Sequence, residues 1–292
     1  MKILLMSFSG TGNTTLCGEF LKNHFEECGH QVDHYQIKES NSFDYDINDY
    51  DLVGFGYPIH AFNAPSNVNK FVKRIKKVEE KKPAFVLMVS GEYMTLNHSS
   101  DNKMKRILNR RNILIDSEYH YIMPYNMIFR HTEKRAYQMY KTMNALSELD
   151  VKDYLIDNKC HKLAKHKGVG WLIWMFRIEQ PFAPVNGKTF KINKKKCVKC
   201  MQCVKNCPTH NIEFKDGKFK FHNHCLCCTR CSFNCPTNAF SIGLLTGWKV
   251  NGKYKFQEPT IEEVDKHPKY CKKSYIRYYK EADERLSQRI DS

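Results

Sequence analysis

The chain has 292 residues, of which 41% are hydrophobic and 13% are aromatic. That much apolar material can bury one large core or two smaller ones, so the composition excludes wholesale disorder, and the length favours two domains. The net charge of +16 is uneven: residues 1–167 contain 24 Lys and Arg against 20 Asp and Glu, whereas residues 168–292 contain 23 against 11. This basic second part indicates an acidic protein, a nucleic acid or an anionic surface as partner, or simply a solvated surface rich in lysine.

Neither a membrane span nor a secretion signal is expected. The most apolar run, residues 171–176, is far shorter than the about 18 residues that a membrane helix needs. The N-terminal residues 1–6 lack a small-residue cleavage site and indicate a buried strand. We therefore expect a soluble, cytoplasmic protein. Disulfides are rare in reducing compartments, so metal or redox roles are the default interpretation for a chain with thirteen cysteines.

The first part, residues 1–167, alternates apolar runs with amphipathic ones. Strands are predicted at residues 2–8, 31–36, 51–56, 83–90 and 113–123. Helices are predicted at residues 14–28, from the candidate cap Asn63 through Ile75, at 99–110, and at 132–165 as one or two helices. This order predicts an α/β domain with a doubly wound, five-stranded parallel sheet and helices on both faces.

Three further segments follow this domain. Residues 168–190 are predicted to be an aromatic and proline-containing linker, in which Trp171, Trp174 and Phe176 pack between the two parts. Residues 191–246 form a small α+β domain with many cysteines, and residues 247–292 form a C-terminal extension with a helix at about 273–290.

The small domain contains a cysteine repeat at an offset of 28 residues. Both copies follow the pattern C-x2-C-x2-C-x3-C-P. In this iron–sulfur spacing three thiolates of one run hold one cluster, and the fourth, turned away by the proline, reaches the other cluster. Zinc is the alternative, although zinc usually takes two C-x2-C pairs and needs no third cysteine at this spacing. The crossed arrangement predicts a first thiol set of Cys197, Cys200, Cys203 and Cys235, and a second thiol set of Cys225, Cys228, Cys231 and Cys207.

This segment resembles the bacterial-type two-cluster ferredoxin domain over about 50 residues, with all eight ligands and both prolines present. The resemblance implies two [4Fe-4S] clusters and a one-electron carrier. Cys227 lies out of register with the repeat and is expected to be a spare side chain. Lysines at 194–196, 199 and 205 are expected to raise the reduction potential by stabilising the reduced clusters.

The loop after the first strand has the composition of a phosphate site. Its hydroxyls, amide and glycines let backbone N–H groups surround an anion at a helix N-terminus. It lacks the lysine of an ATP loop and the G-x-G-x-x-G spacing of an NAD loop, so a monophosphate suits it best. The loop resembles the FMN phosphate loop of flavodoxins, position by position. This phosphate loop comprises Ser9, Gly10, Thr11, Gly12, Asn13 and Thr14.

The resemblance also implies that the loops after the third and fourth strands flank the flavin ring, because ligands of such sheets bind at the carboxyl ends of the strands. Tyr57, His60, Phe62 and Tyr93 are candidates to contact the ring, or are ordinary loop aromatics. Many flavodoxins have a glycine in the first of these loops, and this sequence has none between Tyr57 and Asn63. The two ring loops comprise Tyr57, Pro58, Ile59, His60, Ala61 and Phe62, and Ser90, Gly91, Glu92 and Tyr93.

Together these motifs resemble a family in which a flavodoxin-like domain is fused to a two-cluster ferredoxin. The resemblance implies an electron-transfer iron–sulfur flavoprotein that passes electrons between FMN, two [4Fe-4S] clusters and an external redox partner protein, which the basic charge suggests is acidic. A flavin-dependent reductase of a small substrate such as a quinone is the first alternative, and an iron–sulfur redox sensor that binds nucleic acid is the second. The sequence shows no nucleic-acid-binding signature and no independent catalytic constellation, so we name no catalytic residue and expect no nucleic acid partner.

Overall fold

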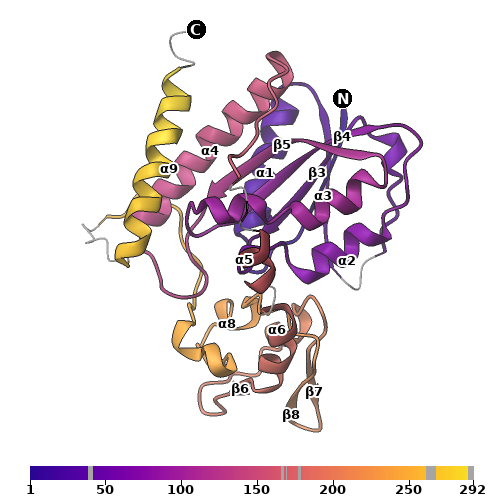
Figure 1. The fold of residues 1–292 in the computed structure, drawn as a ribbon. Coiled ribbons are helices and arrows are strands. Elements are labelled where there is room, and N and C mark those ends of the chain that lie inside the picture. Colours follow the sequence, from indigo (N-terminus) through magenta and orange to yellow (C-terminus); the bar gives the residue numbers. More distant parts are fainter. Residues whose placement is uncertain (39–41, 166–167, 169, 177–178, 261–267, 289–292) are drawn as a thin grey trace.

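A parallel sheet forms the larger part of the molecule in the computed structural model (Figure 1). The structure describes residues 1–292 except 39–41, 166–167, 169, 177–178, 261–267 and 289–292. The five strands lie in the order β2-β1-β3-β4-β5, and every neighbouring pair is parallel. This is the doubly wound α/β fold that the sequence predicts. The strands are β1 (Lys2–Ser7), β2 (Gln31–Gln36), β3 (Leu52–Pro58), β4 (Lys82–Ser90) and β5 (Ile113–Ile122).

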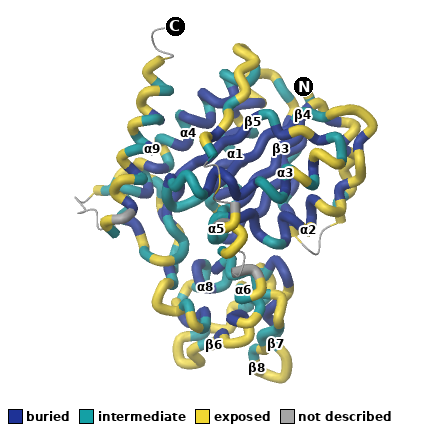
Figure 2. The backbone as a smooth tube through the Cα atoms, in the orientation of Figure 1, coloured by how far each residue is buried: buried dark blue, intermediate teal, exposed yellow. Residues whose placement is uncertain are grey.

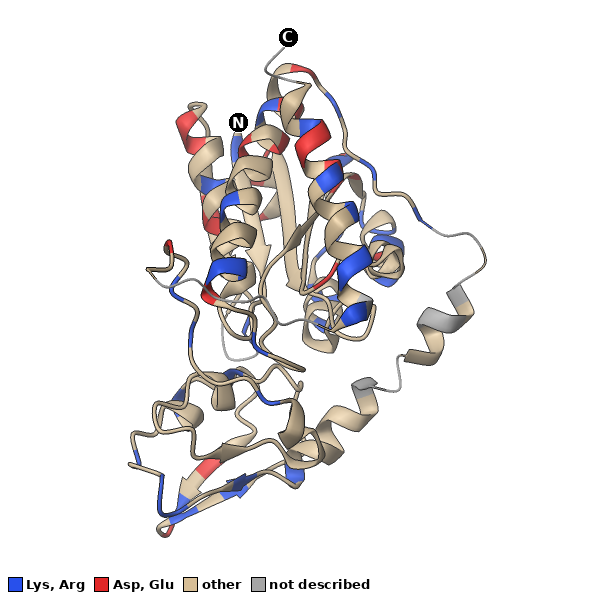
Figure 3. Ribbon diagram, turned by 90° about the vertical axis from the view of Figure 1, so that its left-hand side faces the viewer, with Lys and Arg blue, Asp and Glu red and all other residues tan. Residues whose placement is uncertain are grey.

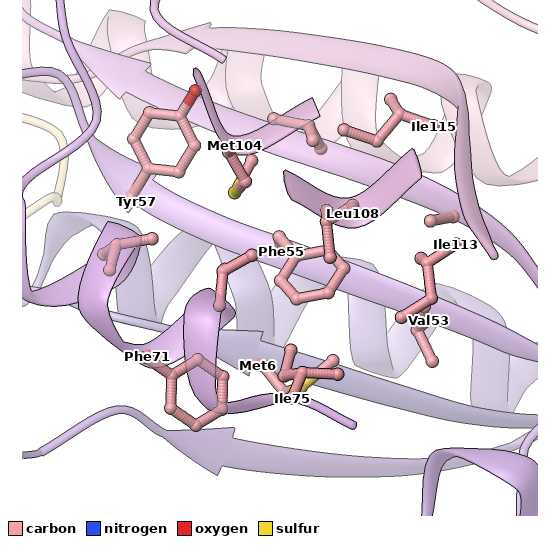
Figure 4. Close-up of a cluster of buried hydrophobic side chains, with 14 of the residues drawn as sticks. Met6, Val53, Phe55, Tyr57, Phe71, Ile75, Met104, Leu108, Ile113 and Ile115 are labelled. Atoms are coloured by element: carbon pink, nitrogen blue, oxygen red, sulfur yellow. The ribbon is translucent and has the colours of Figure 1, made fainter. Parts of the chain in front are cut away.

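The sheet is buried on both faces, which explains why its central strands are almost continuously apolar. Side chains alternate between the faces along β1: Leu4 and Met6 belong to one hydrophobic cluster, and Ile3 and Leu5 belong to the other. Figure 4 shows the first cluster, in which Phe55 of β3 lies among side chains from the covering helices.

Helices cover both faces of the sheet. The cluster of Figure 4 is closed by α2 (Ser66–Arg74) and α3 (Asn102–Asn109). The opposite face is closed by α1 (Asn13–Glu27), α4 (Glu133–Ile156) and the C-terminal helix α9 (Lys269–Ser287). Two short 3₁₀ turns lie in the connections: η1 (Ile47–Asp49) between β2 and β3, and η2 (Thr95–Ser99) between β4 and α3. The chain therefore returns to the larger part after it has built the smaller one (Figure 1).

The ends of three helices differ from the prediction. Helix α2 starts at Ser66 with Pro65 as its cap, because Asn63 is held in a turn by hydrogen bonds of 2.9 Å with His60; the predicted cap at Asn63 is wrong. Helix α4 ends at Ile156, and residues 158–165 have no regular secondary structure. Helix α9 starts at Lys269, four residues earlier than predicted, and residues 289–290 of the predicted helix lie outside the described residues.

Two short helices join the parts, α5 (Gly170–Met175) and α6 (Glu179–Lys188). Trp171 and Trp174 are each 67% exposed, so the prediction that they pack between the parts is wrong for both. Phe176 does reach the larger part, since its ring lies edge-on to Phe62 at 4.9 Å between centroids.

The smaller part has little regular structure. Its elements are β6 (Lys191–Ile192) paired with β9 (Phe240–Ser241), the hairpin of β7 (Ile212–Lys215) and β8 (Lys218–Phe221), α7 (Gln202–Lys205), α8 (Arg230–Phe233) and η4 (Gly243–Trp248). The cysteine repeat is also visible in the backbone, because left-handed φ angles recur at the same offset of 28 residues. They pair Lys199 with Cys227, Met201 with Thr229, and His210 with Asn238.

The smaller part lies beyond the carboxyl ends of the sheet strands, opposite to the N-terminus (Figure 1). Figure 2 shows that the sheet is buried, whereas the smaller part is mostly exposed or half-buried. Among the described residues, no helix has both the length and the apolar composition to cross a membrane.

Candidate cofactor sites

The first thiol set surrounds one cavity. Cys197, Cys200 and Cys203 come from the loop before α7 and its first turn, and Cys235 comes from the end of the other cysteine run. The rest of the lining is largely apolar and includes Ile192, Phe219 and Phe240. The structure therefore brings together the four cysteines that the crossed spacing predicts.

The second thiol set surrounds a separate cavity in the same crossed way. Cys225, Cys228 and Cys231 line it together with Cys207, which comes from the first run. Cys227 also lines this cavity. Among the residues that the structure describes, no three His, Cys, Asp or Glu side chains converge closely enough to hold a single metal ion. Each thiol set therefore lines a cavity, and its sulfur atoms do not converge on a single metal position.

Backbone N–H groups already point at several of these sulfur atoms. The N–H of Asn211 donates to Cys207 Sγ at 3.2 Å, and the N–H of Ala239 donates to Cys235 Sγ at 3.3 Å. These two bonds are related by the repeat. Cys225 Sγ accepts from the N–H of Cys227 at 3.3 Å. Such bonds favour thiolate over thiol and tune the potential of a bound cluster.

Burial opposes thiolate formation in the absence of metal. It raises the pKa of Cys203 to about 11 and that of Cys228 to about 12, and it raises the pKa of Cys231 well above its ordinary value. Binding of iron would therefore displace protons from these thiols.

Cys227 has a different environment from the two thiol sets. It occupies the left-handed position that Lys199 fills in the first copy, with φ near 50° in both. Its Sγ lies 4.0 Å from Asn186 Nδ2. The neighbouring Gly187 has no room for a side chain, since a Cβ there would lie 2.3 Å from Cys225 Cβ. Helix α6 thus closes the second cavity through residues that the sequence did not single out.

The phosphate loop connects β1 to α1. Gly12 caps α1 with a φ of 117°, and no side chain caps the first turn. The first N–H groups of a helix have no partner within the helix, so this end can bind an anion. Gly12 N donates to Ser9 Oγ at 3.0 Å, and Asn13 Nδ2 donates to the carbonyl of Pro124 at 2.9 Å.

One buried oxygen of this loop has no partner. Thr14 is 1% exposed, and its Oγ1 has no hydrogen-bond partner among the described residues. An unpaired buried hydroxyl costs free energy unless a ligand or water pairs with it. A groove of about 670 Å³ reaches Ser9, Gly10, Thr11, Gly12 and Thr15 and extends to Cys235 of the smaller part and Lys253 of the C-terminal extension. The open helix end, the unpaired hydroxyl and the groove all fit a bound phosphate group.

The first ring loop contains a strained turn. His60 and Asn63 exchange backbone hydrogen bonds of 2.9 Å, and the two central residues, Ala61 and Phe62, have φ angles of 41° and 62°. This backbone normally requires glycine or asparagine. Many flavodoxins have a glycine in this loop. Here Ala61 and Phe62 adopt the left-handed backbone although neither is glycine. Tyr57 is fully buried in the hydrophobic cluster of Figure 4, and its hydroxyl lies 3.0 Å from Ser100 Oγ. This burial favours the second of the two alternatives for Tyr57, an ordinary aromatic residue that packs in the core.

The second ring loop packs against the C-terminal helix. Tyr93 is buried, its backbone N–H donates to Ser274 Oγ at 2.5 Å, and its ring lies 5.0 Å from the guanidinium of Arg277. Its ring therefore packs against α9. Burial raises the pKa of Glu92, although hydrogen bonds from Tyr125 and Cys271 oppose this shift.

The phosphate loop and the second thiol set are in contact. A Cβ on Gly10 would lie 2.5 Å from the carbonyl oxygen of Cys228, so the two backbones meet directly. Leu226 and Cys228 also pack against the hydrophobic cluster of the larger part, to which Ile59 of the first ring loop contributes. The candidate flavin site and a candidate cluster site thus share a boundary.

Two residues at this boundary are absent from the sequence prediction. Asn126 Nδ2 donates to Thr11 Oγ1, and the Arg230 guanidinium donates to the carbonyls of Ser9 and Gly10. Asn126 carries no sequence signal. Arg230 does have a sequence signal: it is charged, whereas the equivalent residue in the first copy of the repeat, Gln202, is uncharged.

Comparisons with known proteins identify both parts. The family model of the flavodoxin domain matches residues 4–122, and that of the 4Fe-4S binding domain matches residues 190–213. Solved structures similar to this chain include a flavodoxin from Streptococcus pneumoniae TIGR4 (13% identity, 51% of this chain and 96% of that chain, TM-score 0.36) and the two-electron reduced flavodoxin of Megasphaera elsdenii (17% identity, 40% and 84%, TM-score 0.35). A putative flavoprotein from Bacteroides eggerthii is 21% identical over 41% of this chain and 87% of its own, with a TM-score of 0.32. A comparison with curated proteins finds no match.

The flavodoxin domain implies a flavin, and the 4Fe-4S domain implies an iron–sulfur cluster. The strand order and the cysteine-lined cavities agree with these two assignments. The chain is a fusion of a flavodoxin domain and a ferredoxin-type 4Fe-4S domain, and so an iron–sulfur flavoprotein suited to electron transfer.

Proposed function

We propose that this protein carries electrons between FMN, two [4Fe-4S] clusters and an external redox protein. The observation that carries the proposal is the crossed grouping of eight cysteines around two cavities, one of which adjoins the phosphate loop. The first thiol set would hold one cluster and the second thiol set the other. Bound here, FMN would supply two-electron chemistry and the clusters one-electron chemistry.

The residues of this chain would position these groups for transfer. The amides of the phosphate loop and the Thr14 hydroxyl would hold the FMN phosphate at the start of α1. The contact between Gly10 and Cys228 would keep the second cluster beside the flavin. Phe176, packed against Phe62, would keep the linker over the first ring loop. In this arrangement the second cluster is the one nearest to the flavin.

The first cluster would be the site of exchange with the external protein. Cys200 is exposed, and Lys194, Lys195, Lys196 and Lys199 beside it are exposed as well. Figure 3 shows that Lys and Arg outnumber Asp and Glu on the smaller part. An acidic redox protein would be attracted to this surface, and the rate of its association would fall as salt concentration rises.

The decisive experiment is cofactor analysis of protein purified without oxygen. About eight iron atoms, eight sulfide ions and one FMN per chain are expected for two clusters and one flavin. Only four irons would remove one cluster from the proposal, and zinc in place of iron with no sulfide would overturn it. Reduction of the clusters by photoreduced FMN within one chain would then test the transfer itself, and a Cys228→Ser variant should abolish it.

A further inference from the structure

Arg230 lies where three spaces of the molecule meet. It lines the cavity of the first thiol set, the cavity of the second thiol set and the groove at the phosphate loop. It belongs to the second cysteine run, between Cys228 and Cys231, and it starts helix α8. It is the only charged residue between Cys225 and Cys235.

The guanidinium binds the backbone of both parts. Nε donates to the carbonyl of Gly10 at 2.7 Å, Nη2 donates to the carbonyl of Ser9, and Nη1 donates to the carbonyl of Asn206 at 3.0 Å. These bonds use three of the five N–H donors of arginine, which leaves two for a ligand in the groove. Asn206 immediately precedes Cys207, so the same side chain is also tied to the second thiol set.

The positive charge of Arg230 is not neutralised within the described part of the protein. All three partners are neutral carbonyls, and none of the described carboxylates lies within ion-pair distance of it. The cysteine fold does not require this charge, because Gln202 fills the equivalent position in the first copy and also faces the groove. A half-buried, unneutralised guanidinium is available for anions on either side of it.

Both neighbours of Arg230 would be anionic if the proposed function is correct, and the inference rests on that function. FMN would place its phosphate in the phosphate loop, and each thiolate-bound cluster becomes more negative when it is reduced. We propose that Arg230 is the positioning residue that couples these sites: its charge strengthens the binding of the FMN phosphate and raises the reduction potential of the clusters. The two effects come from one side chain because its guanidinium is fixed between the two loops.

The test compares Arg230→Gln, which copies the residue of the first repeat, with Arg230→Lys, which keeps the charge. Flavin-free protein is titrated with FMN and, separately, with riboflavin, which lacks the phosphate. Arg230→Gln should weaken FMN binding about tenfold, or about 1.4 kcal/mol, and leave riboflavin binding within about twofold. The cluster potential, measured by redox titration, should become more negative by about 59 mV if the one-electron equilibrium changes tenfold. Arg230→Lys should keep most of the original potential.

Arg130 provides the matched control. It also joins the parts through backbone carbonyls, at 2.6 Å to Gly252 and 3.2 Å to Asn251, but it lines neither thiol cavity. Arg130→Gln should therefore leave the cluster potential and the preference for FMN over riboflavin unchanged.

Three outcomes would overturn the inference. One is an equal loss of FMN and riboflavin affinity in Arg230→Gln, and another is a potential shift in Arg230→Lys as large as that in Arg230→Gln. The third is FMN binding and a potential in Arg230→Gln that match the original protein. If Arg230→Gln loses its iron, the FMN and riboflavin titrations of Arg230→Lys test the inference instead. Because the inference requires only the positive charge, Arg230→Lys should still bind FMN more tightly than riboflavin, and loss of that preference would overturn it. Failure of the unaltered protein to bind FMN would instead overturn the proposed function.

Discussion

The two parts of this molecule are stabilised by different means. The flavodoxin domain buries side chains on both faces of a five-stranded sheet, and its clusters include strands and helices from most of the chain. The ferredoxin-type domain has strands of two to four residues, and its fully buried hydrophobic cluster consists of Phe190, Ile212, Phe240 and Ile242. Apolar burial can stabilise the first domain alone, whereas the second has too little of it. Metal binding must supply the difference in a domain of this kind.

This comparison predicts that the two domains unfold separately when iron is removed. Cys228→Ser, or iron chelation, should unfold residues 190–246 and leave the sheet intact, because the lost metal–thiolate bonds have no apolar substitute. Far-ultraviolet circular dichroism reports mainly on the sheet domain, which contains most of the regular secondary structure, and hydrogen exchange follows each domain separately. Hydrogen exchange should lose protection at β7 and β8 and retain it at β3 and β4.

The neighbouring Cys227 is the control for this prediction. It faces the same cavity and lies outside both thiol sets, so Cys227→Ser should keep its iron and its protection from exchange. A smaller part that stays protected after complete iron removal would contradict the comparison.

The second prediction concerns a buried charge network in the flavodoxin domain. Lys165 Nζ lies 2.8 Å from Asp101 Oδ1 and 2.8 Å from Glu118 Oε1, and both carboxylates are almost fully buried. Lys165→Met would leave Asp101 without its cation and Glu118 with Lys105 alone, at 3.4 Å. It should destabilise the domain by about 3–5 kcal/mol in urea titrations followed by circular dichroism. Lys152→Met removes an exposed pair with Glu148 and should cost less than about 1 kcal/mol. Equal effects of the two substitutions would show that the network contributes little.

Local sequence patterns predicted much of this fold. Continuous apolar runs identified the five strands because a parallel sheet buries both faces, and the cysteine spacing specified which thiols share a cavity because the proline redirects the fourth one. The ion network of Lys165 could not be predicted, since its three members lie far apart in the sequence and none has a local signature. The helix α9 itself was predicted, but its packing was not: Tyr275 and Tyr278 join the core of a domain more than a hundred residues earlier.

The candidate flavin site divides in a similar way. The phosphate loop was predictable because a helix N-terminus, two glycines and hydroxyls are consecutive in the sequence. The direction of Tyr57 was not, because a residue at the end of a strand points into the core or out of it according to the register of the sheet. Arg230 differs from both: the sequence shows that its charge breaks the repeat, and only the fold shows that it reaches Ser9 and Gly10.

The third prediction is a pH dependence that belongs to the flavodoxin domain alone. Burial lowers the pKa of His98 and of His120, and the charge of Arg277 adds to the effect on both. Each therefore binds a proton less readily in the folded protein than in the unfolded chain. Stability is complete above the unfolded pKa of about 6.5 and falls as pH decreases toward the folded pKa, by at most about 1.4 kcal/mol per pH unit for each group.

The measurement is a series of urea titrations between pH 7.5 and 5, followed by circular dichroism. His98→Gln should reduce the slope below pH 6.5 by removing one titrating group while keeping a donor for the Ala164 carbonyl. A slope that is the same in this variant would assign the pH dependence to other groups.

The smallest predicted effect concerns left-handed backbone, which occurs in both domains for different reasons. In the smaller part it recurs at paired positions of the repeat, such as Lys199 and Cys227, and belongs to the cysteine loops. In the flavodoxin domain Ala61 adopts it, with a φ of 41°, in the turn that faces the linker. A residue with a Cβ is strained there, so Ala61→Gly should stabilise the flavodoxin domain by about 0.5–1 kcal/mol, after the greater entropy of unfolded glycine is subtracted.

Ala145→Gly, in the interior of α4, should change stability in the opposite direction by about 1 kcal/mol, because that backbone is helical. Opposite signs for one substitution at two positions would show that the turn stores strain. Destabilisation by Ala61→Gly would show that the contact of Phe62 with Phe176 already offsets the backbone strain of the turn. In that case the linker, and not the strand that precedes it, would determine the shape of the first ring loop.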